Sequence, residues 1–324
     1  MSDIVLHGSN SEDLHQGRRH MYDICNTYHR SFIDESTGLI SDHLLEGRCC
    51  PVCAFDASQK IFIKNGGTYV KCNKCGMIYL NPVFKDDELR RYYENNSTVQ
   101  ADSHTNESAF YYAIYSRGLI NIQKYSLPGS ILDIGCSSGF FLDVAIDYGW
   151  QTYGIELNRS EFLIAQSKKH KVWNLPIEEI SPNTKFTAIF MWDVLEHIKD
   201  GNKYLDYLRN HIADNGLIFL QIPNAASIAA RVLQDRCNMF DGIEHVNLYT
   251  PKTITVLCER LGYHILYMET VIDELHVLKK YLNYEDPYFG NHIECPELDF
   301  LTTELIHKYK LGYKLQLILK NQKK

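Results

Sequence analysis

Residues 130–140 read SILDIGCSSGF, an apolar run that passes into a glycine-rich loop and then into an apolar segment with helical spacing. This order predicts a buried strand, a tight turn and the start of a helix. Gly135 and Gly139 favour a close approach of the backbone to a ligand, because glycine has no Cβ and adopts positive φ easily. The segment therefore predicts a ligand-binding loop at the carboxyl end of a strand in an α/β sheet.

Strands and helices alternate on the C-terminal side of this loop. Helices are expected over 140–149, 159–170, 201–212 and 250–262, and strands over 151–157, 171–175, 186–194, 216–223 and 263–271. Strands separated by helices of about 10–15 residues indicate βαβ units and a mostly parallel sheet. The last apolar stretch, 312–320, could close this sheet at one edge.

Composition argues against several classes of protein. The 324 residues carry a net charge of −7, with 45% apolar and 23% charged residues, which is typical of a globular chain. An acidic chain lacks the basic face that tight nucleic-acid binding needs, and no apolar run reaches the length of a membrane span. The first 20 residues lack the apolar stretch of a secretory signal, so we expect a cytoplasmic protein with reduced cysteines.

Four of the ten cysteines form two C-x₂-C pairs separated by 18 residues: Cys50, Cys53, Cys72 and Cys75. This spacing is typical of a structural zinc site with four thiolate ligands. The stretch 61–72 is expected to form a hairpin with Asn65 and Gly66 at its turn. Zinc would supply folding energy that so small a module lacks. The alternative is a set of unrelated buried thiols, and Cys49 could be confused with a ligand.

Two acidic residues lie at the carboxyl ends of the first two expected strands. Asp133 lies just before Gly135, and Glu156 ends the second strand 21 residues after Gly135. A carboxylate at Asp133 would repel a pyrophosphate but suits a ligand with an ammonium group, and one at Glu156 can accept hydrogen bonds from ribose hydroxyls. Together they favour S-adenosylmethionine over a dinucleotide, which would also require a G-x-G-x-x-G loop.

Four segments resemble the motifs of a known family. LDIGCSSGFFLDVA (132–145), YGIELN (153–158), FTAIFMWDVLEHI (186–198) and GLIFLQIPN (216–224) are similar to the successive motifs of class I S-adenosylmethionine-dependent methyltransferases. The resemblance implies a Rossmann-like, seven-stranded sheet with helices on both faces. It also implies these cofactor contacts: Asp133, Gly135, Cys136, Ser137, Gly139, Phe140, Glu156, Leu157, Ile177, Trp192 and Asp193. Arg117, in the helix expected before the core, could pair with the methionine carboxylate of the cofactor, and the alternative is an exposed arginine on a solvated face. Ser137 departs from the glycine that is frequent in the family.

The cysteine module before this core resembles that of zinc-ribbon methyltransferases, a subgroup that includes sugar C-methyltransferases acting on nucleotide-linked deoxysugars. We accordingly divide the chain into an N-terminal extension (1–47), a zinc ribbon (48–84), a helical linker or lid (85–129), the cofactor-binding core (130–275), an insertion that could bind the acceptor (276–308) and a final strand of the core (309–324).

Asp193, Glu196 and His197 follow the fourth expected strand, at an edge of the sheet where ligands lie. On a helix they would share one face, and the cluster resembles a divalent-metal pattern of quinone O-methyltransferases. The alternative is a structural motif beside the cofactor. Trp192, just before the cluster, could lie on the adenine or wall the site.

The segment EHVNLY (244–249) resembles the catalytic segment of the zinc-ribbon sugar C-methyltransferases, in which the histidine is the base. The resemblance implies that His245 takes the proton, that Glu244 orients His245 and that Tyr249 helps to bind the acceptor. His197 is the second candidate for the base. The alternative is that the loop only caps the next helix, with Thr250 as its N-cap; both can hold at once.

We therefore expect an S-adenosylmethionine-dependent methyltransferase with a structural zinc ion. Its acceptor is expected to be a small molecule, a sugar nucleotide or another biosynthetic intermediate, methylated at carbon, oxygen or nitrogen. One alternative is RNA methylation, against which the net charge and the presence of only four lysines within 48–84 argue. Another is a non-catalytic interaction module, against which the intact Asp133, Gly135, Gly139 and Glu156 argue.

Overall fold

The computed structural model describes residues 18–95, 104, 107–181 and 183–322. Its largest sheet has seven strands in the order β10-β9-β8-β11-β12-β15-β14. Strands β8 to β12 are parallel, and β15 runs antiparallel to both of its neighbours. The bounds are Ser130–Ile134 (β8), Gln151–Ile155 (β9), Lys171–Trp173 (β10), Phe186–Trp192 (β11), Ile212–Pro223 (β12), Tyr263–Val271 (β14) and Lys314–Asn321 (β15). The expected Rossmann-like sheet is confirmed.

The last strand, β15, lies inside the sheet and not at its edge. It pairs with β12 on one side and with β14 on the other, so that β14 forms the edge. Leu315, Leu317, Ile318 and Leu319 are all fully buried. The helices on the two faces of the sheet cover these side chains, and the interior position pairs the backbone of β15 along both of its edges. The expectation of an edge strand was therefore wrong.

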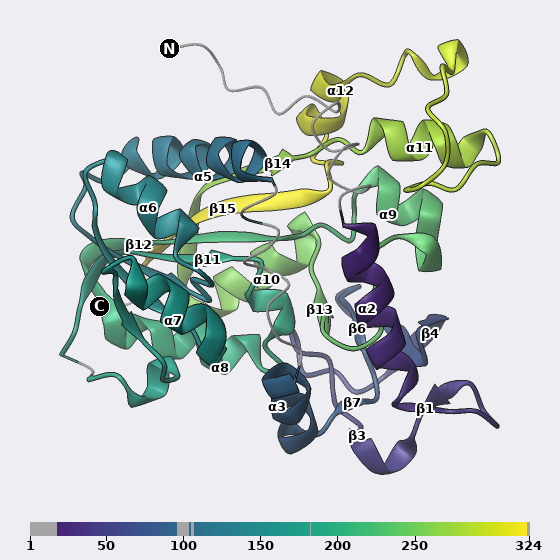
Figure 1. Cartoon of the computed structure of the whole chain (residues 1–324), viewed down its shortest axis with the longest axis horizontal. Coiled ribbons are helices and arrows are strands. Elements are labelled where there is room, and N and C mark those ends of the chain that lie inside the picture. The colour runs from purple at the N-terminus through teal and green to yellow at the C-terminus, as the bar shows by residue number, and fades with distance from the viewer. Residues whose placement is uncertain (1–17, 96–103, 105–106, 182, 323–324) are drawn as a thin grey trace.

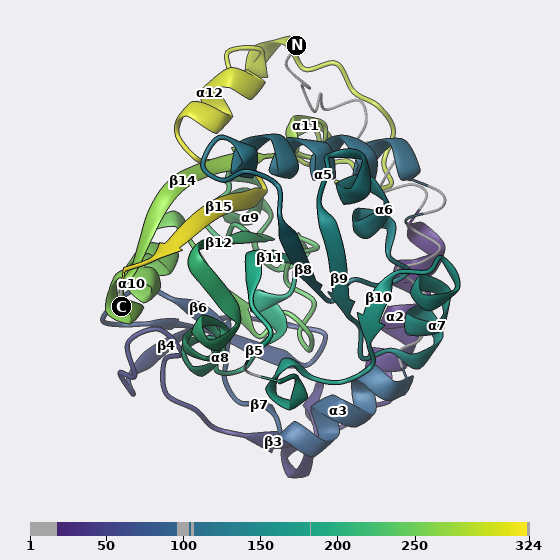
Figure 2. The same ribbon diagram turned by 90° about the vertical axis from the view of Figure 1, so that its left-hand side faces the viewer.

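Helices cover both faces of the sheet (Figures 1 and 2). Helices α5 (Ser108–Gln123) and α6 (Phe140–Asp147) pack on one face, and α8 (Gly201–Leu208) and α10 (Pro251–Leu261) pack on the other, while α7 (Arg159–Ser167) lies beside β10. Side chains alternate between these layers: Phe190 and Phe219 belong to the cluster under α5, and Ile189 and Leu220 belong to the cluster under α8 and α10. This alternation is what period-two strands require.

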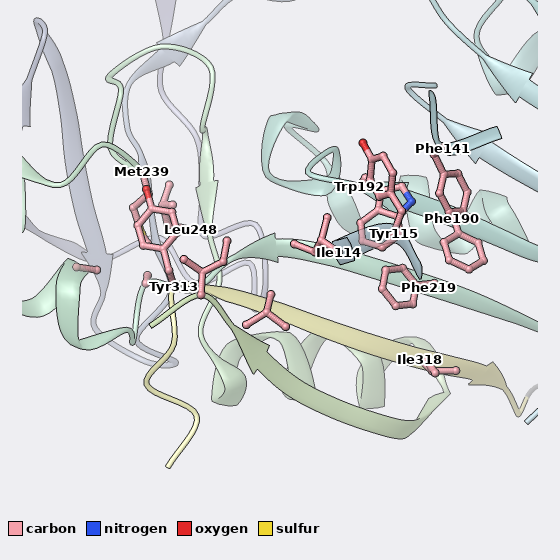
Figure 3. Close-up of a cluster of buried hydrophobic side chains, with 14 of the residues drawn as sticks. Ile114, Tyr115, Phe141, Phe190, Trp192, Phe219, Met239, Leu248, Tyr313 and Ile318 are labelled. Carbon is pink, nitrogen blue, oxygen red and sulfur yellow. The ribbon is translucent and has the colours of Figure 1, made fainter. Parts of the chain in front are cut away.

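Aromatic rings fill the space between α5 and the sheet (Figure 3). The Trp192 ring centroid lies 4.7 Å from that of Tyr115 and 4.6 Å from that of Phe219. Gly118 of α5 lies so close that a Cβ there would meet the Trp192 indole at 2.6 Å. These contacts give Trp192 a place in the core beneath α5, and they do not support the predicted contact with adenine.

Residues 18–95 lie below the large sheet in Figure 2, beside the loops that follow its parallel strands. They form α2 (Arg19–Arg30), the short strands β1 (Ile33–Asp34), β2 (Leu39–Ile40) and β3 (Leu45–Glu46), the hairpin β4 (Ser58–Lys64) and β5 (Gly67–Cys72), then β6 (Ile78–Leu80), β7 (Val83–Phe84) and α3 (Asp86–Asn95). Asn65 and Gly66 have φ values of 46° and 79°, as the expected hairpin turn requires.

The ribbon sheet takes its fourth strand from the core. Its order is β13-β6-β5-β4, and β13 (Asn247–Leu248) lies within the predicted catalytic segment 244–249. The cysteine module is therefore not a separate body, because one sheet joins it to the loop after β12. The sequence offers no signal for this two-residue strand.

The insertion after β14 is partly helical, as expected. It holds α11 (Leu275–Leu282), a 3₁₀ turn (Pro296–Leu298) and α12 (Thr303–Lys308), and α11 packs against α9 (Ile228–Leu233). These elements gather at one corner of the molecule in Figure 1. Across the described residues, we find no helix with the length and apolarity needed to cross a membrane.

Candidate active site

The loop between β8 and α6 has the backbone that its glycines predict. Gly135, Ser137 and Gly139 have φ values of 75°, 49° and 80°. A Cβ at Gly139 would lie 2.8 Å from His170, and one at Gly135 would lie 3.0 Å from Val194. Both positions therefore require glycine for space as well as for conformation. Ser137 also adopts the left-handed conformation, so it replaces a family glycine at a strained position.

Glu156 lies opposite this loop. Its two carboxylate oxygens accept hydrogen bonds from the backbone N–H of Ser137 at 2.8 Å and of Asn158 at 2.7 Å. Burial raises the pKa of Glu156 to about 7, although these two N–H groups act in the opposite direction. Leu157 is 64% exposed and Leu175 is 42% exposed. An ionisable carboxyl beside exposed apolar side chains suits a ribose with its attached adenine.

Asp133, the last residue but one of β8, has a carboxyl group that is almost fully buried. Its Oδ1 atom has no hydrogen-bond partner among the described residues, and burial together with the neighbouring Glu156 raises its pKa well above the ordinary value. A buried carboxyl oxygen normally has a donor, and an ammonium group would supply one. The loop, Asp133 and Glu156 therefore fit S-adenosylmethionine.

Three other predicted cofactor contacts have neighbours within the protein. The Cys136 sulfur faces Gly154, where a Cβ would lie 2.6 Å away. The Phe140 ring stacks on His104 with centroids 5.7 Å apart. Ile177, at the start of a 3₁₀ turn (Ile177–Glu179), is buried in the core.

Arg117 lies on α5 and forms an ion pair with β14. Its Nε and Nη2 atoms donate to the two Glu269 oxygens at 2.9 and 2.5 Å, and Asn121 donates to the same carboxylate at 2.7 Å. A cofactor carboxylate would have to compete with Glu269 for this guanidinium. The structure therefore gives Arg117 a partner other than the predicted one.

His197 and His245 face each other across two loops. Their ring centroids lie 4.9 Å apart. His245 Nδ1 lies 2.7 Å from the Met239 carbonyl oxygen and 3.4 Å from an Asp241 carboxylate oxygen. Because a carbonyl only accepts, Nδ1 carries the proton of a neutral His245 and Nε2 keeps its lone pair, which is the form of a base. Burial and the neighbouring His245 lower the pKa of His197 to about 3.

Asp241 holds the loop that carries His245. Its carboxylate accepts hydrogen bonds from the backbone N–H of Ile243 (2.7 Å), Glu244 (2.8 Å) and His245 (3.0 Å). Burial opposes ionisation, but His245 and the Ile243 N–H keep the pKa of Asp241 below its usual range. Sequence reasoning missed this residue. An aspartate before Gly242 is a turn signal, and it could have drawn attention to the position.

Glu244 has a different partner from the predicted one. The Tyr92 hydroxyl donates to Glu244, and the same hydroxyl lies 2.7 Å from His29 Nε2. Tyr92 comes from α3 and His29 from α2, so the N-terminal helices reach the residue next to His245. In this geometry the Met239 carbonyl and Asp241 orient His245.

Tyr249 is buried in the core. It is 1% exposed, and its hydroxyl packs against Gly201 at the start of α8, where a Cβ would lie 2.7 Å from it. This position favours a structural role over contact with an acceptor. Thr250 does cap α10 as expected, since its side chain accepts from the Thr253 N–H in a capping box with Pro251 at the first helical position.

Asp193 does not share a helix face with Glu196 and His197. The segment Leu195–His197 is a single 3₁₀ turn, and Asp193 has a φ of 54°. The Asp193 carboxylate accepts from Lys314 at 2.9 Å and from Gln221 at 3.0 Å. The helical geometry on which the predicted cluster rested is therefore wrong.

Glu196 lies in a different group of possible metal ligands. The ligand atoms of Glu196, His197 and His245 lie within 4.8 Å of one another. Neither carboxyl oxygen of Glu196 has a hydrogen-bond partner among the described residues, and burial followed by Asp193 raises its pKa well above the ordinary value. A divalent ion at this edge would find this set of ligands and not the predicted one.

The four paired cysteines converge as predicted. The sulfurs of Cys50 and Cys75 lie 3.5 Å apart, those of Cys53 and Cys72 lie 3.6 Å apart, and all four lie within 4.8 Å of one another. Four sulfurs at ~2.3 Å from a tetrahedral zinc ion have similar separations. Although burial opposes it, backbone N–H groups of Cys75 and Lys74 lower the pKa of Cys72 to about 7. This thiol set fits zinc.

Part of the chain is similar in sequence to known proteins. Residues 116–267 match the family model described as a methyltransferase domain. A ubiquinone biosynthesis O-methyltransferase of Bradyrhizobium diazoefficiens is 27% identical over 112 residues, which are 32% of this chain and 44% of that protein. The matched part of the chain thus spans less than half the length of this curated relative.

Solved structures of similar fold include a SAM-dependent methyltransferase from Archaeoglobus fulgidus, with 19% identity and a TM-score of 0.47 over 64% of this chain and 93% of that chain. The plantazolicin methyltransferase BpumL in complex with SAH has 14% identity and a TM-score of 0.49 over 72% of this chain and 94% of that chain. The family match agrees with the seven-stranded sheet and with the geometry of the loop. Residues 116–267 of the chain therefore form a methyltransferase domain.

Proposed function

We propose that this protein methylates a small-molecule acceptor, a sugar nucleotide or another biosynthetic intermediate, and that His245 removes the acceptor's proton. The observation that supports the proposal is the base-competent form of His245, whose Nδ1 atom is engaged by the Met239 carbonyl. His245 lies in the connection that follows β12, after α9 and the 3₁₀ turn Gln234–Arg236, and ligands of parallel folds bind beyond this end of the strands.

We assign cofactor binding and proton removal to different residues of the site. S-adenosylmethionine would supply a methyl group that is already activated as a sulfonium, so the protein mainly has to position and deprotonate the acceptor. Asp133 would bind the ammonium end and Glu156 the ribose. His245 would take the proton at Nε2, and Asp241, 3.4 Å from Nδ1, would stabilise the imidazolium that results. The cysteine set would hold a structural zinc ion, because all four positions are thiols.

The test is the transfer of a labelled methyl group from S-adenosylmethionine into three separate pools: nucleotide sugars and small metabolites, bulk RNA, and protein. We expect label in the small-molecule pool, in a product whose methylated atom can then be located. Label only in protein would contradict the proposal. So would no label anywhere from protein that binds the cofactor, when the small-molecule pool includes the cell's own nucleotide sugars.

His245→Asn separates the base from the rest of the site. Asparagine keeps a polar side chain of similar size but cannot take a proton near neutral pH. We expect turnover to fall about 100-fold or more, while the affinity for S-adenosylmethionine changes less than twofold. A variant with the wild-type rate would remove His245 as the base and leave His197 as the candidate.

RNA methylation remains the second candidate because of one surface feature. A hollow of about 460 Å³ beside the cysteine cluster is lined by Lys71, Lys74 and Lys252, among others. Three ammonium groups around one hollow could bind phosphates. Label in the RNA pool, lost at high salt, would favour this candidate.

A cytoplasmic location is part of the proposal, since a reducing compartment keeps the four thiols available for zinc.

A further inference from the structure

The zinc ribbon supports the backbone on both sides of His245. Strand β13, two residues after His245, pairs antiparallel with β6 of the ribbon. The backbone N–H of Leu80 donates to the Val246 carbonyl at 3.0 Å, and the buried Arg48 guanidinium donates to the same carbonyl at 2.5 Å. The chain that leaves the base therefore enters the ribbon sheet at once.

A single ribbon hydroxyl spans the turn before this strand. Tyr69, on β5, donates to the His245 carbonyl at 3.1 Å and accepts from the Gly242 N–H at 3.2 Å. The Tyr69 side chain is fully buried. Burial also raises the pKa of Tyr69 well above its usual value, so the hydroxyl keeps its proton and can donate and accept together. It connects the first and the last residue of the turn Gly242–His245.

The hairpin turn of the ribbon packs directly on the same loop. A Cβ on Gly67 would overlap the Gly242 carbonyl, and a Cβ on Gly242 would overlap the Lys64 carbonyl. Asn65 Nδ2 donates to the Asp241 carbonyl at 2.9 Å. Two backbones in direct contact leave no space for the loop to move toward the ribbon, and the Tyr69 hydroxyl opposes movement away from it.

We propose that Tyr69 is a positioning residue for His245, and that the ribbon thereby forms part of the proton-transfer site. The inference rests on the proposed function only where it takes His245 to be the base. The Met239 carbonyl and Asp241 can hold the imidazole in one tautomer only while the backbone from 241 to 245 keeps its turn. Without the Tyr69 hydroxyl, a buried N–H and a buried carbonyl lose a partner, and a turn with unpaired buried groups opens more often.

The test is Tyr69→Phe in the full-length, zinc-loaded chain, with ¹⁵N-labelled histidine read by NMR. The His245 signals are identified as those missing from His245→Asn. In the wild type we expect His245 as a single Nδ1–H tautomer. In Tyr69→Phe we expect averaged signals from both tautomers. Asp241, His197 and Glu196 are the titratable neighbours of His245 and are unchanged in this variant, so the readout isolates the backbone.

Hydrogen exchange gives a second readout in the same samples. The backbone N–H groups of Glu244 and His245 bond to Asp241 and not to Tyr69. We expect their protection to fall about tenfold in Tyr69→Phe, since two hydrogen bonds that hold the turn are lost. The matched control is Tyr263→Phe. It removes a buried hydroxyl that donates to the Leu205 carbonyl at 2.7 Å, far along the chain from this loop, and it should leave both readouts unchanged.

A second variant keeps the inference testable if Tyr69→Phe fails to fold or to retain zinc. Asn65→Gly removes the amide contact with the Asp241 carbonyl, together with an exposed contact with Asn26 at 3.3 Å, and glycine accepts the positive φ of the turn. It should shift the His245 tautomer in the same direction by a smaller amount. An unchanged tautomer in folded Tyr69→Phe, or in Asn65→Gly where that variant is the one available, would overturn the inference. Neither the tautomer measurement nor the hydrogen-exchange measurement needs cofactor or acceptor. A negative result for Tyr69 can therefore be distinguished from a negative result in the methyl-transfer assay.

Discussion

The proposed contact of Glu156 with the ribose, together with the raised pKa of this residue, predicts that cofactor binding depends on pH. Ribose hydroxyls donate hydrogen bonds, so the ionised carboxylate is the form that binds them best. Burial holds the pKa of Glu156 at about 7. A group with a raised pKa is protonated below that value, so the affinity should increase as the pH rises through 7.

The size of the effect follows from the ionised fraction. With a pKa of about 7, roughly one tenth of Glu156 is ionised at pH 6 and roughly nine tenths at pH 8. Since the apparent Kd scales inversely with the binding-competent fraction, it should fall about tenfold between these two pH values. The suitable ligand is methylthioadenosine, which keeps the adenine and ribose but lacks the titrating amino group of the full cofactor.

Calorimetric titration of methylthioadenosine at several pH values from 6 to 8 gives the measurement. Glu156→Gln should bind more weakly and show no pH dependence in this range. Glu161→Gln should move the midpoint below 7, because the charge of Glu161 raises the pKa of Glu156. An affinity that does not vary with pH in the wild type, or a full slope that persists in Glu156→Gln, would refute the assignment of Glu156 to the ribose.

Three further predictions concern the other parts of the site. Asp133→Asn should weaken S-adenosylmethionine about 10- to 100-fold, as expected for a lost charged hydrogen bond, and should leave methylthioadenosine unchanged; equal loss for both ligands would contradict the ammonium contact. Cys50→Ser should lower the zinc content from one equivalent toward zero and destabilise residues 48–84, and a full equivalent by elemental analysis would contradict the ligand set. Dialysed wild-type protein should contain zinc alone and bind no second divalent ion, and a second equivalent that Glu196→Gln removes would instead assign an ion to Glu196, His197 and His245.

The fold could be predicted because its signals are local. The strand at 130–134, the loop glycines and the alternation of apolar segments each specify structure within about 15 residues. The cysteine spacing likewise predicts convergence of four sulfurs, which the structure shows. The position of β15 in the strand order was missed because an alternating apolar pattern predicts a strand but not the strands beside it. Its interior position depends on apolar side chains on both faces, of which the sequence 314–321 shows only a partial pattern.

The site was only partly predictable because side chains compete for partners across the fold. The sequence around Arg117 does not indicate that its partner is Glu269, which lies 152 residues away. Lys314 reaches Asp193 only because β15 returns to the centre of the sheet. In each case we expected a charged side chain to contact the ligand, but in the structure this side chain forms an ion pair with a residue of opposite charge that is distant in the sequence. Residue types and spacing therefore predict candidates, and tertiary pairing decides among them.

The ribbon shows why a catalytic loop can need a structural partner from elsewhere in the chain. Between the 3₁₀ turn Gln234–Arg236 and β13, the chain has no regular structure of its own, yet its backbone is largely buried and must find hydrogen-bond partners. Asp241 satisfies the N–H groups of three residues, and Tyr69 satisfies one more N–H and the carbonyl of His245. The core supplies the first set and the ribbon the second. The cysteine module beside the methyltransferase core is then explained by the loop that it holds in place, since His245, as the proposed base, would be effective only when its nitrogen stays at a fixed position.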